Sequence, residues 1–222
     1  MKFITATFGQ VLYQMPMDEI RPPSGIDNLA AIQAVVARYR FAEFPTQNDL
    51  KDIPGKGIIF KIGAAHLDGL PREIASLGIY NDGILVTAVN TDNAELIFTD
   101  LFGWAIETFG FRNPLSPPRR SYSSQVVVDF DASIDDLVTG FSKIADLLNG
   151  GLVKCGAAEF DLHVARLAIS ADPHVVRFPA QSSFYIEPRG GVPVGRHRYF
   201  SGAPLPTPLH LELLEQIERL LT

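Results

Sequence analysis

Residues 73–90, EIASLGIYNDGILVTAVN, contain two runs of apolar and β-branched residues separated by Asn81, Asp82 and Gly83. These runs predict strands over 73–80 and 84–90. Because Asn, Asp and Gly tolerate the positive φ angles of tight hairpin turns, the connection predicts an antiparallel pair. A helix follows directly, from a capping box formed by Asp92 and Glu95 to a stop at Gly110. A hairpin that leads into a helix does not fit the strand–helix alternation of parallel-sheet folds.

The same signals extend in both directions from this stretch. Upstream they predict a helix capped near Asp27 and ending near Phe41, then a strand over 57–62. Downstream they predict strands over 125–130 and 158–169, and a helix between them that stops at 149–151. Further strand-like pieces occupy 174–178, 183–187 and 196–200, before a last helix from Thr207. The sequence therefore predicts an α+β fold of antiparallel sheets built from hairpins, with helices packed on one face and no Rossmann or TIM rhythm.

The length of 222 residues fits one compact domain over 1–222. Three prolines within 114–118 forbid a helix there, so 112–120 has the composition of a linker. A division into two lobes, 1–111 and 121–222, is the alternative that this segment leaves open.

Composition excludes several classes of protein. An apolar fraction of 46% is too high for a disordered chain, and no apolar stretch is long enough to span a membrane. The single cysteine forms no intrachain disulfide, and the N-terminal apolar run is too short for a signal peptide, so we expect a cytoplasmic location. The net charge of −6 argues against strong binding of nucleic acid.

The common catalytic signatures are absent from the sequence. It contains no phosphate-binding loop, no dinucleotide-binding glycine motif, and none of the patterns HExxH, CxxC and GxSxG. No cofactor is expected, and an enzymatic function is not favoured.

One polar constellation would suit an enzyme. The predicted strand over 158–169 places Glu159, Asp161 and His163 on one face, where they could ligate a metal or act as an oriented general base. Such a face is more often simply the solvated side of a half-buried strand. His66 and Asp68 are weaker candidate metal ligands, because Asp-Gly is also ordinary turn chemistry.

The helix over 92–109 carries more aromatic residues than one buried stripe holds. Phe98, Phe102, Trp104 and Phe109 suit a protein–protein interface, where aromatic residues are enriched. They equally suit a helix buried between two layers of the same protein.

Residues 189–200 combine cations and aromatic rings in a glycine-rich segment. Arg189, Arg196, Arg198 and Tyr199 could grip an anion or stack on bases. The alternative, that these arginines pair with acidic groups, fits the negative net charge better.

These features favour a non-enzymatic, cytoplasmic protein-interaction module, such as an accessory subunit or an inhibitor or immunity-type partner. It would bind another protein or itself as a homo-oligomer, without a membrane. One alternative is a small metal- or His/carboxylate-dependent hydrolase that uses Glu159, Asp161 and His163. The other is single-stranded nucleic-acid binding through residues 189–200.

Overall fold

The structure is a computed structural model that describes residues 1–46, 57–134, 139–154, 163–170 and 183–221. The chain divides into two compact units. Unit 1 comprises Met1–Thr5, Gln125–Ala203 and Pro208–Thr222, and unit 2 comprises Ala6–Ser124 and Pro204–Thr207. The division into lobes at 112–120 stays a prediction.

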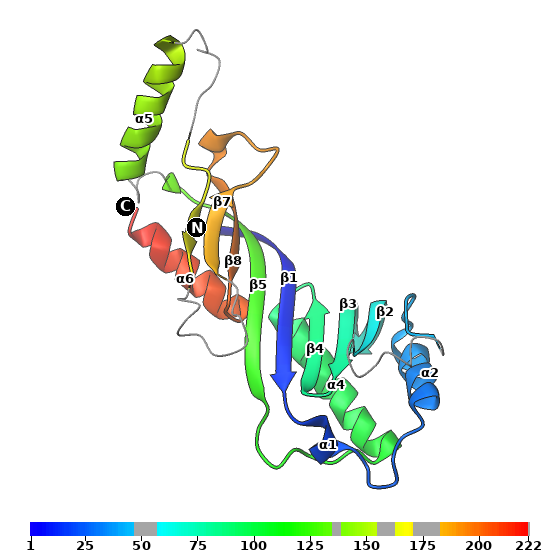
Figure 1. Ribbon diagram of the computed structural model, residues 1–222. Coiled ribbons are helices and arrows are strands. Elements are labelled where there is room, and N and C mark those ends of the chain that lie inside the picture. The colour runs from blue at the N-terminus through cyan, green and yellow to red at the C-terminus, as the bar shows by residue number, and fades with distance from the viewer. Residues whose placement is uncertain (47–56, 135–138, 155–162, 171–182, 222) are drawn as a thin grey trace. The chain divides into compact units, whose positions relative to one another are not determined.

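The described strands form a sheet with the order β2-β3-β4-β1-β5-β8-β7-β6 (Figure 1). The strands are β1 (Lys2–Gln14), β2 (Ile58–Leu67), β3 (Leu70–Tyr80), β4 (Gly83–Ala88), β5 (Arg119–Asp129), β6 (Leu167–Ile169), β7 (Phe184–Pro188) and β8 (Arg198–Ala203). The α-helices are α1 (Met17–Ile20), α2 (Asn28–Tyr39), α4 (Thr91–Phe109), α5 (Thr139–Lys154) and α6 (Thr207–Arg219). The predicted α+β class is confirmed.

Two hairpins connect β2, β3 and β4 in unit 2, and β1 pairs with β4. The predicted hairpin between β3 and β4 is confirmed, with Tyr80 paired to Gly83 across Asn81 and Asp82. The reason given for it is wrong, because neither Asn81 nor Asp82 has a positive φ. The turn between β2 and β3 is the one that uses this conformation, with φ of 51° at Asp68 and 74° at Gly69.

Helices α2 and α4 of unit 2 begin at side-chain caps. The Asp27 carboxylate accepts hydrogen bonds from the first turn of α2, as predicted. At α4 the cap is Asn90, whose side chain accepts from the Asn93 amide at 2.8 Å. The predicted pairing of Asp92 with Glu95 is therefore wrong, and Glu95 instead accepts a hydrogen bond from the Tyr122 hydroxyl at 2.7 Å. Helix α4 packs on β2, β3 and β4, and α2 packs on β2.

Strand β2 stands first in the strand order, and part of its outer edge is occupied. The backbones of Lys61 and Glu43 exchange hydrogen bonds of 2.9 and 3.2 Å. The next residue, Ile62, has a φ of 56°, which is rare for a β-branched side chain and bends the strand locally.

Unit 1 contains the antiparallel pairs β6–β7 and β7–β8, with Tyr185 opposite Gly202 and Glu187 opposite Phe200. In α6, Leu214 is fully buried. The predicted helix stop at 149–151 is wrong, since α5 continues to Lys154. A Cβ atom at Gly150 or Gly151 would meet nothing within 4 Å, so the helix carries these glycines only at their intrinsic cost of about 1 kcal/mol each.

Several predicted strands of unit 1 are shorter than expected or lie outside the described residues. Of the strand over 158–169, residues 163–166 have no regular structure and Leu167–Ile169 is a strand. The alternation used for this prediction covers only the residues before 165, and most of those fall within 155–162, outside the described residues. The piece over 174–178 also lies outside them. No helix in the described part of the chain combines the length and the apolar run needed to cross a membrane.

Candidate functional site

The aromatic residues of α4 pack inside unit 2. The ring of Phe98 stacks on Tyr13 of β1, with centroids 3.5 Å apart, and on Phe102 at 5.5 Å. Trp104 meets Phe109 edge-on at 5.2 Å and Tyr39 of α2 at 6.3 Å. Phe98 is buried and the other three residues predicted as an interface are half-buried, so most of their surface is already covered within unit 2.

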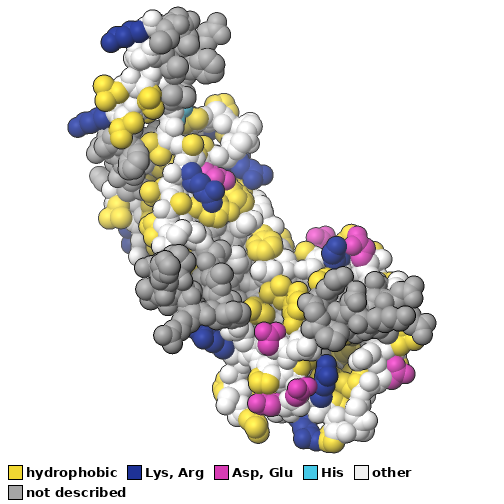
Figure 2. Space-filling view, in the orientation of Figure 1, with side chains coloured by type: hydrophobic (Ala, Val, Ile, Leu, Met, Phe, Trp, Pro, Cys, Tyr) yellow, Lys and Arg dark blue, Asp and Glu magenta, His cyan; other side chains and the backbone are white. Residues whose placement is uncertain are grey.

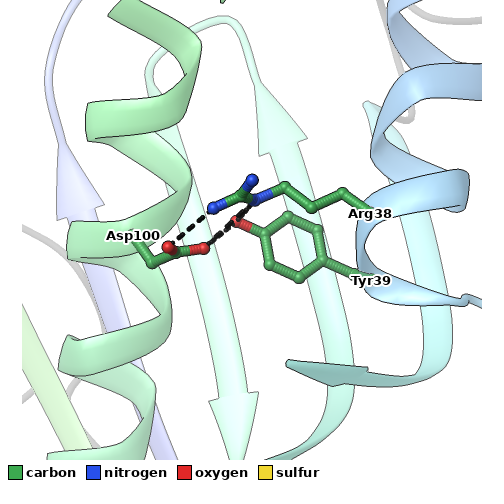
Figure 3. A network of polar contacts seen from close by, with 3 residues as sticks. All are labelled: Arg38, Tyr39 and Asp100. Atoms are coloured by element: carbon green, nitrogen blue, oxygen red, sulfur yellow. Dashed lines mark hydrogen bonds and ion pairs between the residues drawn. The ribbon is translucent and has the colours of Figure 1, made fainter. Parts of the chain in front are cut away.

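A polar network ties α2 to α4 beside these rings (Figure 3). The Asp100 carboxylate accepts hydrogen bonds from Arg38 at 2.8 Å and from the Tyr39 hydroxyl at 2.6 Å. Burial raises the pKa of Tyr39, and its hydrogen bond to Asp100 raises it further. The Arg38 guanidinium also lies over the Trp104 ring at 5.1 Å. These contacts fix the orientation of both helices and of Trp104.

A cavity of about 90 Å³ lies in unit 2 between α1, α2, the strands β2 to β4 and the second half of α4. Most of its lining is apolar and includes Met17, Val35, Ile84, Leu101, Phe102 and Trp104. Arg21 and Asn28 are the polar residues among the described lining residues. The cavity therefore offers an apolar interior, and the half-exposed Arg21 is the charged residue at its edge.

The arginines of the segment 189–200 have different surroundings. Arg198 makes a bidentate ion pair with Asp129, at 2.6 and 2.8 Å, and this hydrogen bonding lowers the pKa of the Asp129 carboxyl. Arg189 lies over the Phe200 ring at 5.6 Å, and Arg196 is exposed. Among the described residues, neither Arg189 nor Arg196 forms an ion pair.

Tyr199 is the residue of this segment whose placement corrects the sequence prediction. Its side chain is only 1% exposed, and its hydroxyl accepts a hydrogen bond from the Ile134 amide at 3.1 Å. Because Tyr199 belongs to the core of unit 1, its ring is not available to stack on a ligand.

Two other aromatic residues occupy the opposite face of the β7–β8 pair, and sequence analysis missed their arrangement. Tyr185 and Phe200 lie with ring centroids 6.0 Å apart, and the Arg166 guanidinium stacks on Tyr185 at 4.0 Å. A Cβ atom at Gly202 would lie 2.4 Å from the Tyr185 ring, so a glycine is needed for this ring to lie across β8. The alternation Arg198, Tyr199, Phe200 was the available signal, since it puts Phe200 on the face opposite Tyr199.

The predicted metal and catalytic residues do not form a site in the described structure. His66 is exposed on β2, and Asp68 takes the first position of the two-residue turn between β2 and β3. His163 is exposed and not on a strand, while Glu159 and Asp161 lie outside the described residues. In the described part of the chain, no three His, Cys, Asp or Glu side chains gather where they could hold a metal ion.

Helix α5 leaves its apolar side chains more exposed than α4 does, where Leu96 is 38% exposed. Ile144, Leu147 and Leu148 are 53%, 77% and 54% exposed. Their spacing of three and four residues puts them on one face of the helix. Figure 2 shows hydrophobic side chains on the surface of α5, with basic side chains nearby.

A buried histidine joins α6 to β8. His210 is fully buried, and its Nε2 lies 3.0 Å from the Ser201 hydroxyl. That hydroxyl donates its only proton to the Tyr185 carbonyl at 2.7 Å, so it must accept from His210, whose neutral ring therefore carries its proton on Nε2. Burial lowers the pKa of His210 to about 4. The sequence contains no local signal for this role.

Comparisons with known proteins add a distant likeness. No protein-family model matches the chain, and no curated protein matches its sequence. Among solved structures, the chain is similar to one titled "Methanococcus jannaschii TBP", with 10% sequence identity and a TM-score of 0.46 over 98% of this chain and 97% of that chain. This likeness is too distant to bear on the function of the chain.

Proposed function

We propose that the chain is a non-enzymatic protein-interaction module that self-associates through α5, in the role of an accessory subunit or an inhibitor-type partner. The observation that carries the proposal is the apolar face formed by Ile144, Leu147 and Leu148. Exposed apolar residues that gather on one helix face are typical of protein-binding surfaces. A single cysteine suits work in a reducing compartment, and the cytoplasm is the location we propose.

A second copy of α5 is the occupant that best matches this face. The charged side chains nearest to this face leave its centre apolar: Lys143 borders it beside Leu147, and Asp146, two residues after Ile144, lies on the opposite side of the helix, and both are exposed. In an antiparallel pair related by a two-fold axis across this face, Ile144, Leu147 and Leu148 of one copy would pack against the same apolar face of the other copy. Isologous two-fold pairing of this kind is the commonest form of homo-oligomer.

Light scattering across a range of protein concentrations tests the proposal. We expect a mass approaching twice 24.3 kDa at high concentration. Leu147→Lys should return the protein to a monomer, because it places a charge in the apolar seam. Leu115→Lys is the matched control, since Leu115 is 89% exposed in unit 2 and should leave the mass unchanged. A wild-type monomer at every concentration, or a dimer that survives Leu147→Lys, would contradict the proposal.

Binding of single-stranded nucleic acid is a second candidate function, favoured by the sheet face of unit 1. Tyr185 and Phe200 form a pair of neighbouring rings, with Arg166 and Arg189 stacked on them. Aromatic rings combined with cations are the usual means of holding unpaired bases. The segment 189–200 contributes Phe200 and Arg189 to this face rather than Tyr199.

Fluorescence anisotropy with a labelled oligonucleotide tests this candidate. Binding should weaken as salt rises, and Phe200→Ala should lower the affinity by about tenfold, because stacking on one ring contributes about 1–3 kcal/mol. Phe44→Ala, a substitution of an exposed ring in unit 2, is the matched control. An affinity that is insensitive to salt or equal in the two variants would remove this candidate.

A further inference from the structure

The apolar cavity of unit 2 offers a binding site independent of α5. Its volume of about 90 Å³ is well above the roughly 10–15 Å³ that a cavity needs to hold one water molecule. A buried water needs two to four polar partners, and the lining provides few. Empty apolar cavities of somewhat larger size, about 150 Å³, take up small apolar molecules such as benzene. The interior therefore suits a short hydrocarbon group.

Arg21 supplies the charge complement at this cavity. Its side chain is 48% exposed, and its acidic neighbour Asp18 lies 3.9 Å away with 95% of its side chain in solvent. An exposed pair at that distance holds the guanidinium weakly, so its donors are available to a ligand. The planar guanidinium matches a carboxylate through two parallel hydrogen bonds.

We propose that the cavity binds a short-chain carboxylate, with its alkyl tail among the apolar residues beside Trp104 and its carboxylate on Arg21. The size of the cavity sets the specificity. Pockets for drug-sized ligands and cofactors measure about 300–1,000 Å³, so this one accepts only the first few carbons of a chain. Each methylene that becomes buried should tighten binding about fourfold until the cavity is full.

The tryptophan provides a direct readout, because Trp104 is the single tryptophan of the chain and lines the cavity. Titration at pH 7 with acetate, butyrate, valerate, isovalerate and octanoate should give a saturable change in Trp104 fluorescence. The affinity should rise from acetate to valerate and fall for octanoate, whose tail exceeds the cavity. Butylamine and pentanol match the tail without the negative charge, and we expect both to bind at least tenfold more weakly than valerate.

Two variants locate the site. Ala105→Leu fills the cavity and should abolish the response, whereas Thr108→Leu adds the same group at an exposed position of α4 and should not. Arg21→Gln should weaken valerate binding at least tenfold without affecting pentanol. Arg119→Gln is its control, since Arg119 is exposed and does not line the cavity.

Several results would overturn the proposal. They are the absence of a saturable response in the wild type, equal binding of pentanol and valerate, and valerate binding that Arg21→Gln leaves unchanged. Because Arg21 is half exposed, Arg21→Gln should keep the fold, so a misfolded Ala105→Leu variant would not prevent the test. The oligomeric state of the protein has no part in any of these outcomes.

Discussion

In unit 2, Phe98 of α4 lies against Tyr13 and Phe102, and only 8% of its surface is exposed. In unit 1, Leu147 of α5 is 77% exposed. Both helices are rich in apolar residues, yet the described residues of unit 2 cover Phe98, whereas those of unit 1 leave Leu147 exposed. An apolar helix is therefore evidence for a partner only when the rest of its unit leaves it uncovered.

The largest expected effect tests this contrast directly. Phe98→Ala should lower the free energy of unfolding of unit 2 by about 3–5 kcal/mol, because it removes a buried ring and leaves a cavity. Leu147→Ala should change the free energy of unfolding by less than about 0.5 kcal/mol in the monomer, since its side chain is already in solvent. Urea unfolding followed by Trp104 fluorescence and by circular dichroism measures the two variants. Equal losses of stability would contradict the assignment of α4 to the core and of α5 to the surface.

The second prediction concerns the pH dependence of unit 1. His210 has a pKa of about 4 in the folded state against 6.5 when unperturbed, so between these values the unfolded state binds its proton more strongly. The contribution of neutral His210 to the free energy of unfolding is fully present above pH 6.5 and is lost as the pH falls to about 4. The loss amounts to about 3 kcal/mol, since one pKa unit corresponds to about 1.4 kcal/mol.

Urea midpoints at pH 7 and pH 4.5, with hydrogen exchange of the α6 amides, measure this effect. His210→Gln should remove the part of the stability loss between pH 7 and pH 4.5 that comes from His210. His66→Gln replaces an exposed histidine, and this variant should lose as much stability between the two pH values as the wild type does. If His210→Gln and the wild type lost the same stability between the two pH values, the buried neutral histidine would not be the cause.

The smallest effect is expected at the network that joins α2 to α4. Asp100→Asn removes a charge that accepts from Arg38 and Tyr39, and should cost about 1–2 kcal/mol, because the group is only partly buried. Unfolding followed by Trp104 fluorescence is the measurement, since Arg38 also contacts that ring. Glu107→Gln, at an exposed position of the same helix, is the control. A cost no larger than that of the control would mean that apolar packing alone holds α2 on α4.

Local patterns predicted most of the elements of the fold. Turn residues and runs of apolar, β-branched residues located β3 and β4, and Asp27 and Gly110 located the start of α2 and the end of α4. The predictions failed where two local signals competed. Asn90 and Asp92 are both residue types that cap helices well. Which of them caps α4 depends on where β4 ends, and the local helix pattern carries no information on that.

The surroundings of the site residues were less predictable, because contacts between distant segments decide them. Nothing near Trp104 in the sequence shows that Arg38 and Tyr39 approach it. The exposure of α5 and the cavity beside α1 likewise depend on which segments come to lie nearby. Tyr199 is the exception, because strict alternation with Arg198 and Phe200 would have placed its ring on the inner face.

The outer strands of the sheet bear on how copies of this protein can meet. An unpaired strand edge invites intermolecular strand addition, the route to fibrous aggregates. Strand β2 is bent at Ile62 and hydrogen-bonded at Lys61 by Glu43, and β6 extends only over Leu167–Ile169. Both edges are therefore poor templates for a strand from another copy. Association at high concentration should add little cross-β structure and should proceed without the lag phase of fibril formation.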